Sequence, residues 1–227
     1  GLGCTNVENG DEKSLLPEKL EAAKGTAPAG LWPVGNDAAP SQDLAIAALL
    51  DDEKLQGPGM RGIVVVKNGR IIGERYGEGF SSDTPLLGWS MTKTVNAAVI
   101  GTLVRDGKLR LDQDGVLVSW AGDSRKAITL ADLMGMSGGL IFNEDYGDVT
   151  DVTRMLFLKG DMAHFATEKP LEAKPGLKFN YSSGTAVLLS RIWQNAIGVE
   201  SLKYPGQALF GPLGMNSAVF ETDASGT

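Results

Sequence analysis

Residues Leu87-Gly88-Trp89-Ser90-Met91-Thr92-Lys93-Thr94 decide the fold expected for this chain. They place Ser90 and Lys93 directly before an apolar run over residues 95–104 that has helical spacing. A helix that begins near Ser90 puts both side chains on one face, one turn apart. A serine hydroxyl is a poor nucleophile at its own pKa, and a neighbouring lysine amine can act as its base. The backbone N–H groups of the first turn are expected to favour an oxyanion beside Ser90.

A serine at the start of a helix has a second interpretation, because serine is also a preferred N-cap residue. The Ser-x-x-Lys spacing is short and occurs often by chance, so it needs support from the rest of the chain. The context therefore decides between a nucleophile and a cap.

The composition limits the classes of function. The chain has 227 residues, of which 42% are hydrophobic and 22% charged, and its formal net charge is -7. This is typical of a globular protein with one large or two small domains. The absence of a basic cluster argues against nucleic acid as a partner. The single cysteine, Cys4, and the single histidine, His164, exclude an internal disulfide and argue against a zinc site, so neither a metal nor a cofactor is expected.

Three tempting motifs are rejected on their context. Gly57, Gly59 and Gly62 fit a dinucleotide-binding pattern, but they precede a predicted strand instead of following one. Ser137 lies in a literal G-x-S-x-G, but a helix precedes it and no helix follows, so a glycine-rich turn is the better interpretation. His164 has no motif around it and is interpreted as a surface or cap histidine.

The clearest predicted element is a β-hairpin. Residues 62–67 form an apolar strand, Asn68-Gly69 supplies a two-residue turn, and residues 70–76 return. Helices are expected to begin at Ser41, near Ser90 and at Thr129, and to cover residues 151–159, 185–197 and 201–210.

Tyr181 precedes a predicted helix, much as Ser90 does. A tyrosine hydroxyl beside a lysine ammonium has a lowered pKa and can carry protons to and from a serine oxygen. The alternative is an aromatic side chain packed on the core, with Ser182 or Ser183 as the N-cap.

Taken together, Ser90-Met91-Thr92-Lys93 and Tyr181-Ser182-Ser183 resemble the penicillin-recognising serine hydrolase superfamily. The closer resemblance is to its class C β-lactamase-like branch, which includes esterases, D-aminopeptidases and 6-aminohexanoate-dimer hydrolases. It covers roughly residues 43 to 221 and rests on an ordered set of further motifs: the 64–76 hairpin, Leu109-Arg110-Leu111-Asp112, residues 128–134 leading to Ser137-Gly138-Gly139-Leu140, Pro175-Gly176, and Pro212-Leu213-Gly214-Met215.

The resemblance implies an α+β, β-lactamase/transpeptidase-like fold, with an antiparallel sheet flanked by helices. It implies that Ser90 is acylated, that Lys93 is the base that activates it, and that Tyr181 is the acid/base for the leaving group or the deacylating water. Ser183 stands where β-lactamases of this branch usually carry asparagine, and is a substrate-binding candidate. The shorter serine is more like the 6-aminohexanoate-dimer hydrolase and esterase members, so a small amide or ester is the expected substrate.

The chain also departs from the family pattern. No Lys-Thr-Gly-like triplet on a strand follows Tyr181, and the sequence predicts only two good strands. We expect this chain to be an N-terminal portion, completed by a C-terminal fragment that carries the remaining strands. The expected organisation is an arm over residues 1–40, an α/β part over 41–108 and 175–227, and a helical subdomain over 109–174.

Localisation and the competing functions stay open at this point. Cys4 follows Gly3 near the start and resembles the lipid-attachment end of bacterial lipoproteins, which favours a periplasmic or secreted protein anchored through Cys4; a cytoplasmic protein is the alternative. The competing functions are a β-lactamase or D,D-peptidase, and a non-catalytic member that binds peptides or peptidoglycan.

Overall fold

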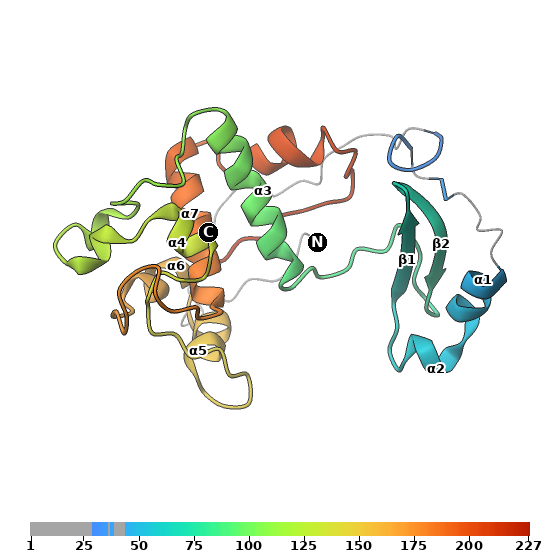
Figure 1. Ribbon diagram of the computed structural model, residues 1–227, viewed down its shortest axis with the longest axis horizontal. Coiled ribbons are helices and arrows are strands. Elements are labelled where there is room, and N and C mark those ends of the chain that lie inside the picture. Colours follow the sequence, from blue (N-terminus) through green and yellow to red (C-terminus); the bar gives the residue numbers. More distant parts are fainter. Residues whose placement is uncertain (1–28, 36, 39–43) are drawn as a thin grey trace. The chain divides into compact units, whose positions relative to one another are not determined.

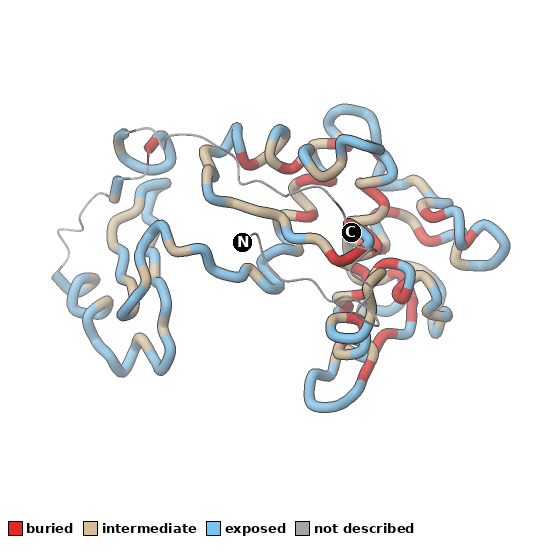
Figure 2. Tube along the Cα trace, turned by 180° about the vertical axis from the view of Figure 1, so that it is seen from behind, coloured by how far each residue is buried: buried red, intermediate tan, exposed pale blue. Residues whose placement is uncertain are grey.

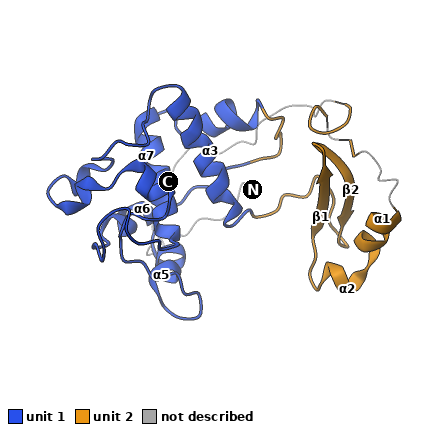
Figure 3. Cartoon of the chain, in the orientation of Figure 1, with its two compact units in different colours: residues 1–22, 88–212, 219–227 blue, residues 23–87, 213–218 orange. Residues whose placement is uncertain are grey.

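The computed structural model describes residues 29–35, 37–38 and 44–227 (Figure 1). The chain forms two compact units, coloured separately in Figure 3. The first holds residues 88–212 and 219–227, and the second holds residues 213–218 and the described part of 23–87. Most of the predicted 1–40 arm, including Cys4, lies outside the described residues.

The second unit is built on the predicted hairpin, which the structure confirms. Strands β1 (Gly62–Lys67) and β2 (Arg70–Tyr76) are antiparallel, and they form the sheet of the described part of the chain. Asn68 and Gly69 have φ values of 50° and 69°, as a tight hairpin turn requires. Helices α1 (Leu44–Asp51) and α2 (Glu53–Gln56) precede the strands, and α1 contacts β2.

The first unit is helical, and α7 (Ser183–Ile197) is its central element. It contacts α3 (Met91–Arg105), α4 (Leu130–Met134), α5 (Asp151–Leu158) and α6 (Met162–Thr167). Two short 3₁₀ helices, Val118–Trp120 and Ser124–Ala127, join α3 to α4. Figure 2 shows that buried residues concentrate in this unit, whereas the hairpin is mostly exposed or half-buried.

Two buried hydrophobic clusters lie in the first unit. Val99 and Leu103 of α3 pack in the same cluster as Trp120, Leu133 and Leu188, so part of the 109–174 segment shares a core with the Ser90 helix. A second cluster consists of Phe142, Val152, Met155 and Phe165, and the division into a helical subdomain over 109–174 stays a prediction. The sequence gives no clear hydrophobic period between 109 and 120, so this shared packing could not be read from it.

The start of α4 agrees with the sequence, and the last helical segment is shorter and less regular than predicted. Thr129 and Asp132 form a reciprocal capping box at α4, as the predicted start at Thr129 implies. The predicted helix over 201–210 is confirmed in part: residues 201–203 form turns, residues 204–205 are α-helical, and Gly206–Phe210 continues as a π-helical segment. Pro205 offers no backbone N–H and the adjacent Gly206 is a weak helix former, so a regular helix is disfavoured there.

Candidate active site

The chain enters α3 through a tight turn that exposes the Ser90 side chain. Trp89 has a φ of 44°, an unusual value for a residue other than glycine, and Ser90 follows at the N-cap position. The Ser90 side chain makes no capping hydrogen bond. The capping interpretation of Ser90 therefore does not describe its hydroxyl, which points elsewhere.

The same turn corrects the expected oxyanion donors. The Met91 N–H donates to the Gly88 carbonyl and the Thr92 N–H to the Trp89 carbonyl, both at 3.0 Å. These first-turn N–H groups are thus already paired inside the turn and are not aimed at a ligand. The expectation of Met91 and Thr92 N–H groups that favour an oxyanion is therefore not met.

Two side chains converge on the Ser90 hydroxyl oxygen. Lys93 Nζ lies one helical turn along α3 and donates to Ser90 Oγ at 3.1 Å. The Tyr181 hydroxyl, 91 positions further along the chain, donates to the same oxygen at 2.7 Å. Lys93 Nζ also lies 4.7 Å from the centre of the Tyr181 ring. The structure therefore brings the three predicted catalytic residues together.

Lys93 changes the chemistry of Tyr181. The pKa of the Tyr181 hydroxyl is lowered from its usual value, first by its interaction with the Lys93 ammonium and then by its hydrogen bond with Ser90. A nearby cation stabilises the phenolate, which is the charged form of tyrosine. With 40% of its surface exposed, Tyr181 can exchange protons with a ligand or with solvent. It is thus placed to act as an acid or a base beside Ser90.

Ser183, the substrate-binding candidate, joins this group from the first position of α7. Ser182 is the N-cap of α7, and its side chain accepts a hydrogen bond from the Thr185 N–H at 2.9 Å. Ser183 is thus free of that role, and its Oγ accepts a hydrogen bond from Lys93 Nζ at 3.3 Å. The ammonium group of Lys93 is therefore held between the hydroxyls of Ser90 and Ser183.

Asn96 fixes α3 against α7 one turn below the cluster. Its side chain is buried, donates to the Ala186 carbonyl at 2.9 Å, and accepts from Trp193 Nε1 at 2.7 Å. A buried side-chain amide with both ends bonded holds two helices in one register. The distances among Ser90, Lys93 and Ser183 depend on this register.

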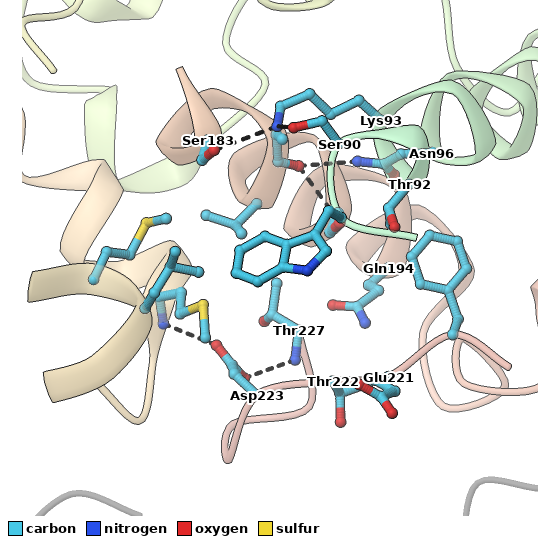
Figure 4. A pocket seen from close by; sticks show the side chains of 18 of the residues that line it. Ser90, Thr92, Lys93, Asn96, Ser183, Gln194, Glu221, Thr222, Asp223 and Thr227 are labelled. Carbon is cyan, nitrogen blue, oxygen red and sulfur yellow. Dashed lines mark hydrogen bonds between the residues drawn. The ribbon is translucent and has the colours of Figure 1, made fainter. Parts of the chain in front are cut away.

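A pocket of about 300 Å³ opens beside the cluster (Figure 4). Ser90, Lys93 and Ser183 lie together on one side of it, and Asp223 and Thr222 lie on the opposite side. Apolar side chains such as Met155, Val187 and Phe220 also line it. A mainly apolar pocket with a few convergent polar groups is the usual form of a small-molecule site.

Ser137 and His164, which the sequence analysis rejected as catalytic residues, lie outside the Ser90 cluster. The Ser137 hydroxyl donates to the Asp132 carbonyl at 3.2 Å. The carbonyls of Met136 and Ser137 accept from the N–H groups of Asn180 and Gly176, both at 2.8 Å, so this glycine-rich turn supports the segment that leads to Tyr181. His164 lies on α6, its side chain is 69% exposed, and it is not among the residues that line the pocket.

Sequence reasoning missed two residues of the site. Asn96 is one polar residue inside an apolar helical run, and its burial depends on the approach of α7. Glu144 accepts hydrogen bonds from Ser183 and lies in a loop without periodicity. The sequence marks Glu144 only by a polar run, Asn143-Glu144-Asp145, that follows three apolar residues, and such a run does not indicate a functional residue.

Two properties of the described residues complete this account. No helix among residues 29–35, 37–38 and 44–227 is long and apolar enough to cross a membrane. Over the same ranges, no three histidine, cysteine, aspartate or glutamate side chains gather in a way that could hold a metal ion.

The helical unit, the hairpin and the Ser-x-x-Lys helix start define a β-lactamase/transpeptidase-like protein. The chain belongs to the β-lactamase family, whose model matches residues 44–227, and thus to the penicillin-recognising serine hydrolase superfamily. Among curated proteins, none is significantly similar to it.

Two solved structures show the same fold. One is a Bacteroides dorei DSM 17855 protein assigned as a β-lactamase, at 28% identity and a TM-score of 0.59, covering 76% of this chain and 50% of that one. The other is a Bacillus anthracis protein assigned as a 6-aminohexanoate-dimer hydrolase, at 19% identity and a TM-score of 0.56, covering 82% of this chain and 53% of that one. The chain thus spans about half the length of each of these proteins.

Proposed function

We propose that this protein is a serine hydrolase that cleaves small amides or esters through an acyl-enzyme on Ser90. The observation that carries the proposal is the convergence of Lys93 Nζ and the Tyr181 hydroxyl on Ser90 Oγ, at 3.1 and 2.7 Å. Membership of the β-lactamase family supports it. A binding protein of the same fold has no need for all three groups.

The proposed reaction has two acyl transfers. Ser90 Oγ attacks the substrate carbonyl carbon and its proton passes to Tyr181 in its phenolate form, which the Lys93 ammonium stabilises; the tetrahedral intermediate then expels the amine or alcohol, which takes up that proton. Water next attacks the ester on Ser90, gives a proton to the same phenolate, and releases the acid as Ser90 recovers its hydrogen. Each proton taken up in one half-reaction is returned within it, so the enzyme is regenerated.

A β-lactamase or D,D-peptidase is the second candidate, favoured by the likeness to the Bacteroides dorei protein. Ser183 argues against it, because its side chain is shorter than the asparagine usual there and carries a single donor, which is engaged with Glu144.

The test compares wild-type protein with Ser90→Ala on an activated ester and on a chromogenic β-lactam. Turnover of the ester by wild type and none by Ser90→Ala is the expected result. Efficient turnover of the β-lactam would favour the second candidate. Equal turnover by both proteins would overturn the assignment of Ser90, and no turnover by either would overturn the proposal and favour a non-catalytic, peptide-binding member of the fold.

A further inference from the structure

Glu144 makes two hydrogen bonds to one residue of the Ser90 site. Its carboxylate accepts from the Ser183 backbone N–H at 2.8 Å and from the Ser183 hydroxyl. A serine hydroxyl has a single hydrogen, so once it is donated to Glu144 the oxygen can only accept. Lys93 Nζ is the donor that it accepts from, at 3.3 Å. Glu144, Ser183 and Lys93 thus form a directed chain of hydrogen bonds that ends at Ser90.

The packing around Glu144 fixes this arrangement. Phe142 is buried against the start of α7, where a Cβ atom on Gly184 would collide with its ring. Asn143 donates its backbone N–H to Asp151 Oδ2 at 3.0 Å and accepts from the Val152 N–H at 3.1 Å. The residues before Glu144 are therefore anchored both to α7 and to α5.

Glu144 is also the acid of its loop that is bonded to Ser183. Asp145 accepts from the Gly147 N–H at 2.8 Å, and Asp151 pairs with Lys169 at 2.6 Å. The ionisable groups gathered around Ser90 are thus Lys93 from α3, Tyr181 from the segment before α7, and Glu144 from the 140–150 loop.

We propose that Glu144 is a positioning residue of the Ser90 site, which acts through the Ser183 hydroxyl to hold the Lys93 ammonium between Ser90 and Tyr181. This inference rests on the proposed function and assigns Ser183 to the support of Lys93 instead of to the substrate. A lysine side chain has four rotatable bonds, so an anchor on its ammonium removes unproductive conformations.

A simpler role for Glu144 must be separated from this one. A carboxylate at the N-terminus of a helix stabilises the helix, and Glu144 accepts the first N–H of α7. This capping role uses the backbone N–H of Ser183, whereas positioning of Lys93 uses its hydroxyl. Ser183→Ala removes the hydroxyl that reaches Lys93 and keeps the backbone N–H that Glu144 caps, so the two roles can be told apart.

The experiment measures esterase activity against pH for wild type, Glu144→Gln, Ser183→Ala and the double variant, together with thermal unfolding. Glu168→Gln is the matched control, because Glu168 is an exposed acid that lies beside His164. We expect Glu144→Gln to lower the maximal rate by roughly tenfold or more. Its ascending pH limb should move to higher pH, because a Lys93 ammonium that is no longer held beside Tyr181 lowers the pKa of that hydroxyl less.

One result for these variants would support the proposal, and two would overturn it. The double variant should be no slower than the slower single variant, because the two residues act in series. An unchanged pH limb in Glu144→Gln with a lower melting temperature would overturn the proposal and leave a helix cap. Additive losses in the double variant would overturn it as well.

An absorbance titration of Tyr181 separates this proposal from the proposed function, because Lys93 is the first cause of its lowered pKa. If wild type hydrolyses no ester but the titration midpoint of Tyr181 still moves to higher pH in Glu144→Gln and in Ser183→Ala, the positioning contact stands and the hydrolase assignment fails. If the midpoint is the same in all variants, the positioning proposal fails, whatever the activity.

Discussion

The Tyr181 hydroxyl lies 2.7 Å from Ser90 Oγ, although 91 positions separate the two residues. The contact joins the start of α3 to the segment before α7, and Lys93 lies against both partners. Two residues that each have an ordinary structural interpretation in the sequence therefore share one reactive centre. The following predictions depend on this contact and on the packing that maintains it.

Removal of the Ser90 hydroxyl should abolish acyl transfer. We expect Ser90→Ala to lower kcat for an activated ester by about 10³-fold or more, because no other group can form the covalent intermediate. Steady-state kinetics check this. Ser137→Ala is the control, and its activity should stay near that of wild type; a larger loss in Ser137→Ala than in Ser90→Ala would reverse the assignment.

Tyr181 should titrate below the usual value of about 10 for tyrosine. Its pKa is lowered by Lys93 and by Ser90, so the phenolate, and any activity that needs it, gains population at a lower pH than for a free tyrosine. The difference between the tyrosinate absorbance titrations of wild type and Tyr181→Phe isolates this group. Tyr76→Phe is the matched control, because burial and then Glu74 raise the pKa of Tyr76.

Loss of the Lys93 charge should move Tyr181 in the opposite direction. In Lys93→Met the phenolate loses its nearest cation, so the pKa of Tyr181 should rise toward its usual value and the ester activity should fall. The same absorbance titration measures the first effect. Lys126→Met, at an exposed lysine, should change neither quantity; a Tyr181 titration that is equal in both variants would contradict the account.

Gly184 should be intolerant of a side chain. A Cβ atom there would collide with the Phe142 ring, so Gly184→Ala should lower the free energy of unfolding by about 1–3 kcal/mol, the usual cost of overpacking. Gly101→Ala is the control, because nothing lies within 4 Å of the added atom and alanine favours a helix by about 0.5–1 kcal/mol. Chemical denaturation of both variants checks the difference in sign.

The buried bridge between α3 and α7 should contribute to stability. Asn96→Ala leaves the buried Trp193 Nε1–H without its partner, which should cost about 1–3 kcal/mol. A double-mutant cycle with Trp193→Phe in chemical denaturation measures the coupling. Strictly additive effects would show that the bridge adds nothing beyond the two separate side chains.

Features set by neighbouring residues were predictable from the sequence. Asn68-Gly69 fixes the hairpin because few residues accept its two positive φ values, and Ser90 meets Lys93 because α3 places them one turn apart. The start of α4 at Thr129 follows from the same kind of local chemistry. In each case the partners lie within a few positions of one another.

Contacts between distant segments were harder to predict. Tyr181 was reached through a family resemblance, and its hydroxyl meets Ser90 only because Asn96 and Trp193 hold α3 against α7. Glu144 was missed because its contact with Ser183 depends on the fit of Phe142 against Gly184. The first-turn N–H groups were misjudged because the turn at Trp89 is not visible in the spacing.

The most direct test of the central claim is mass spectrometry of the protein after reaction with a fluorophosphonate serine probe, followed by peptide mapping of the adduct. The account predicts one adduct, located on Ser90, and its loss in Ser90→Ala and in Tyr181→Phe at equal reaction time. An adduct on Ser137, or no adduct on folded protein, would contradict it.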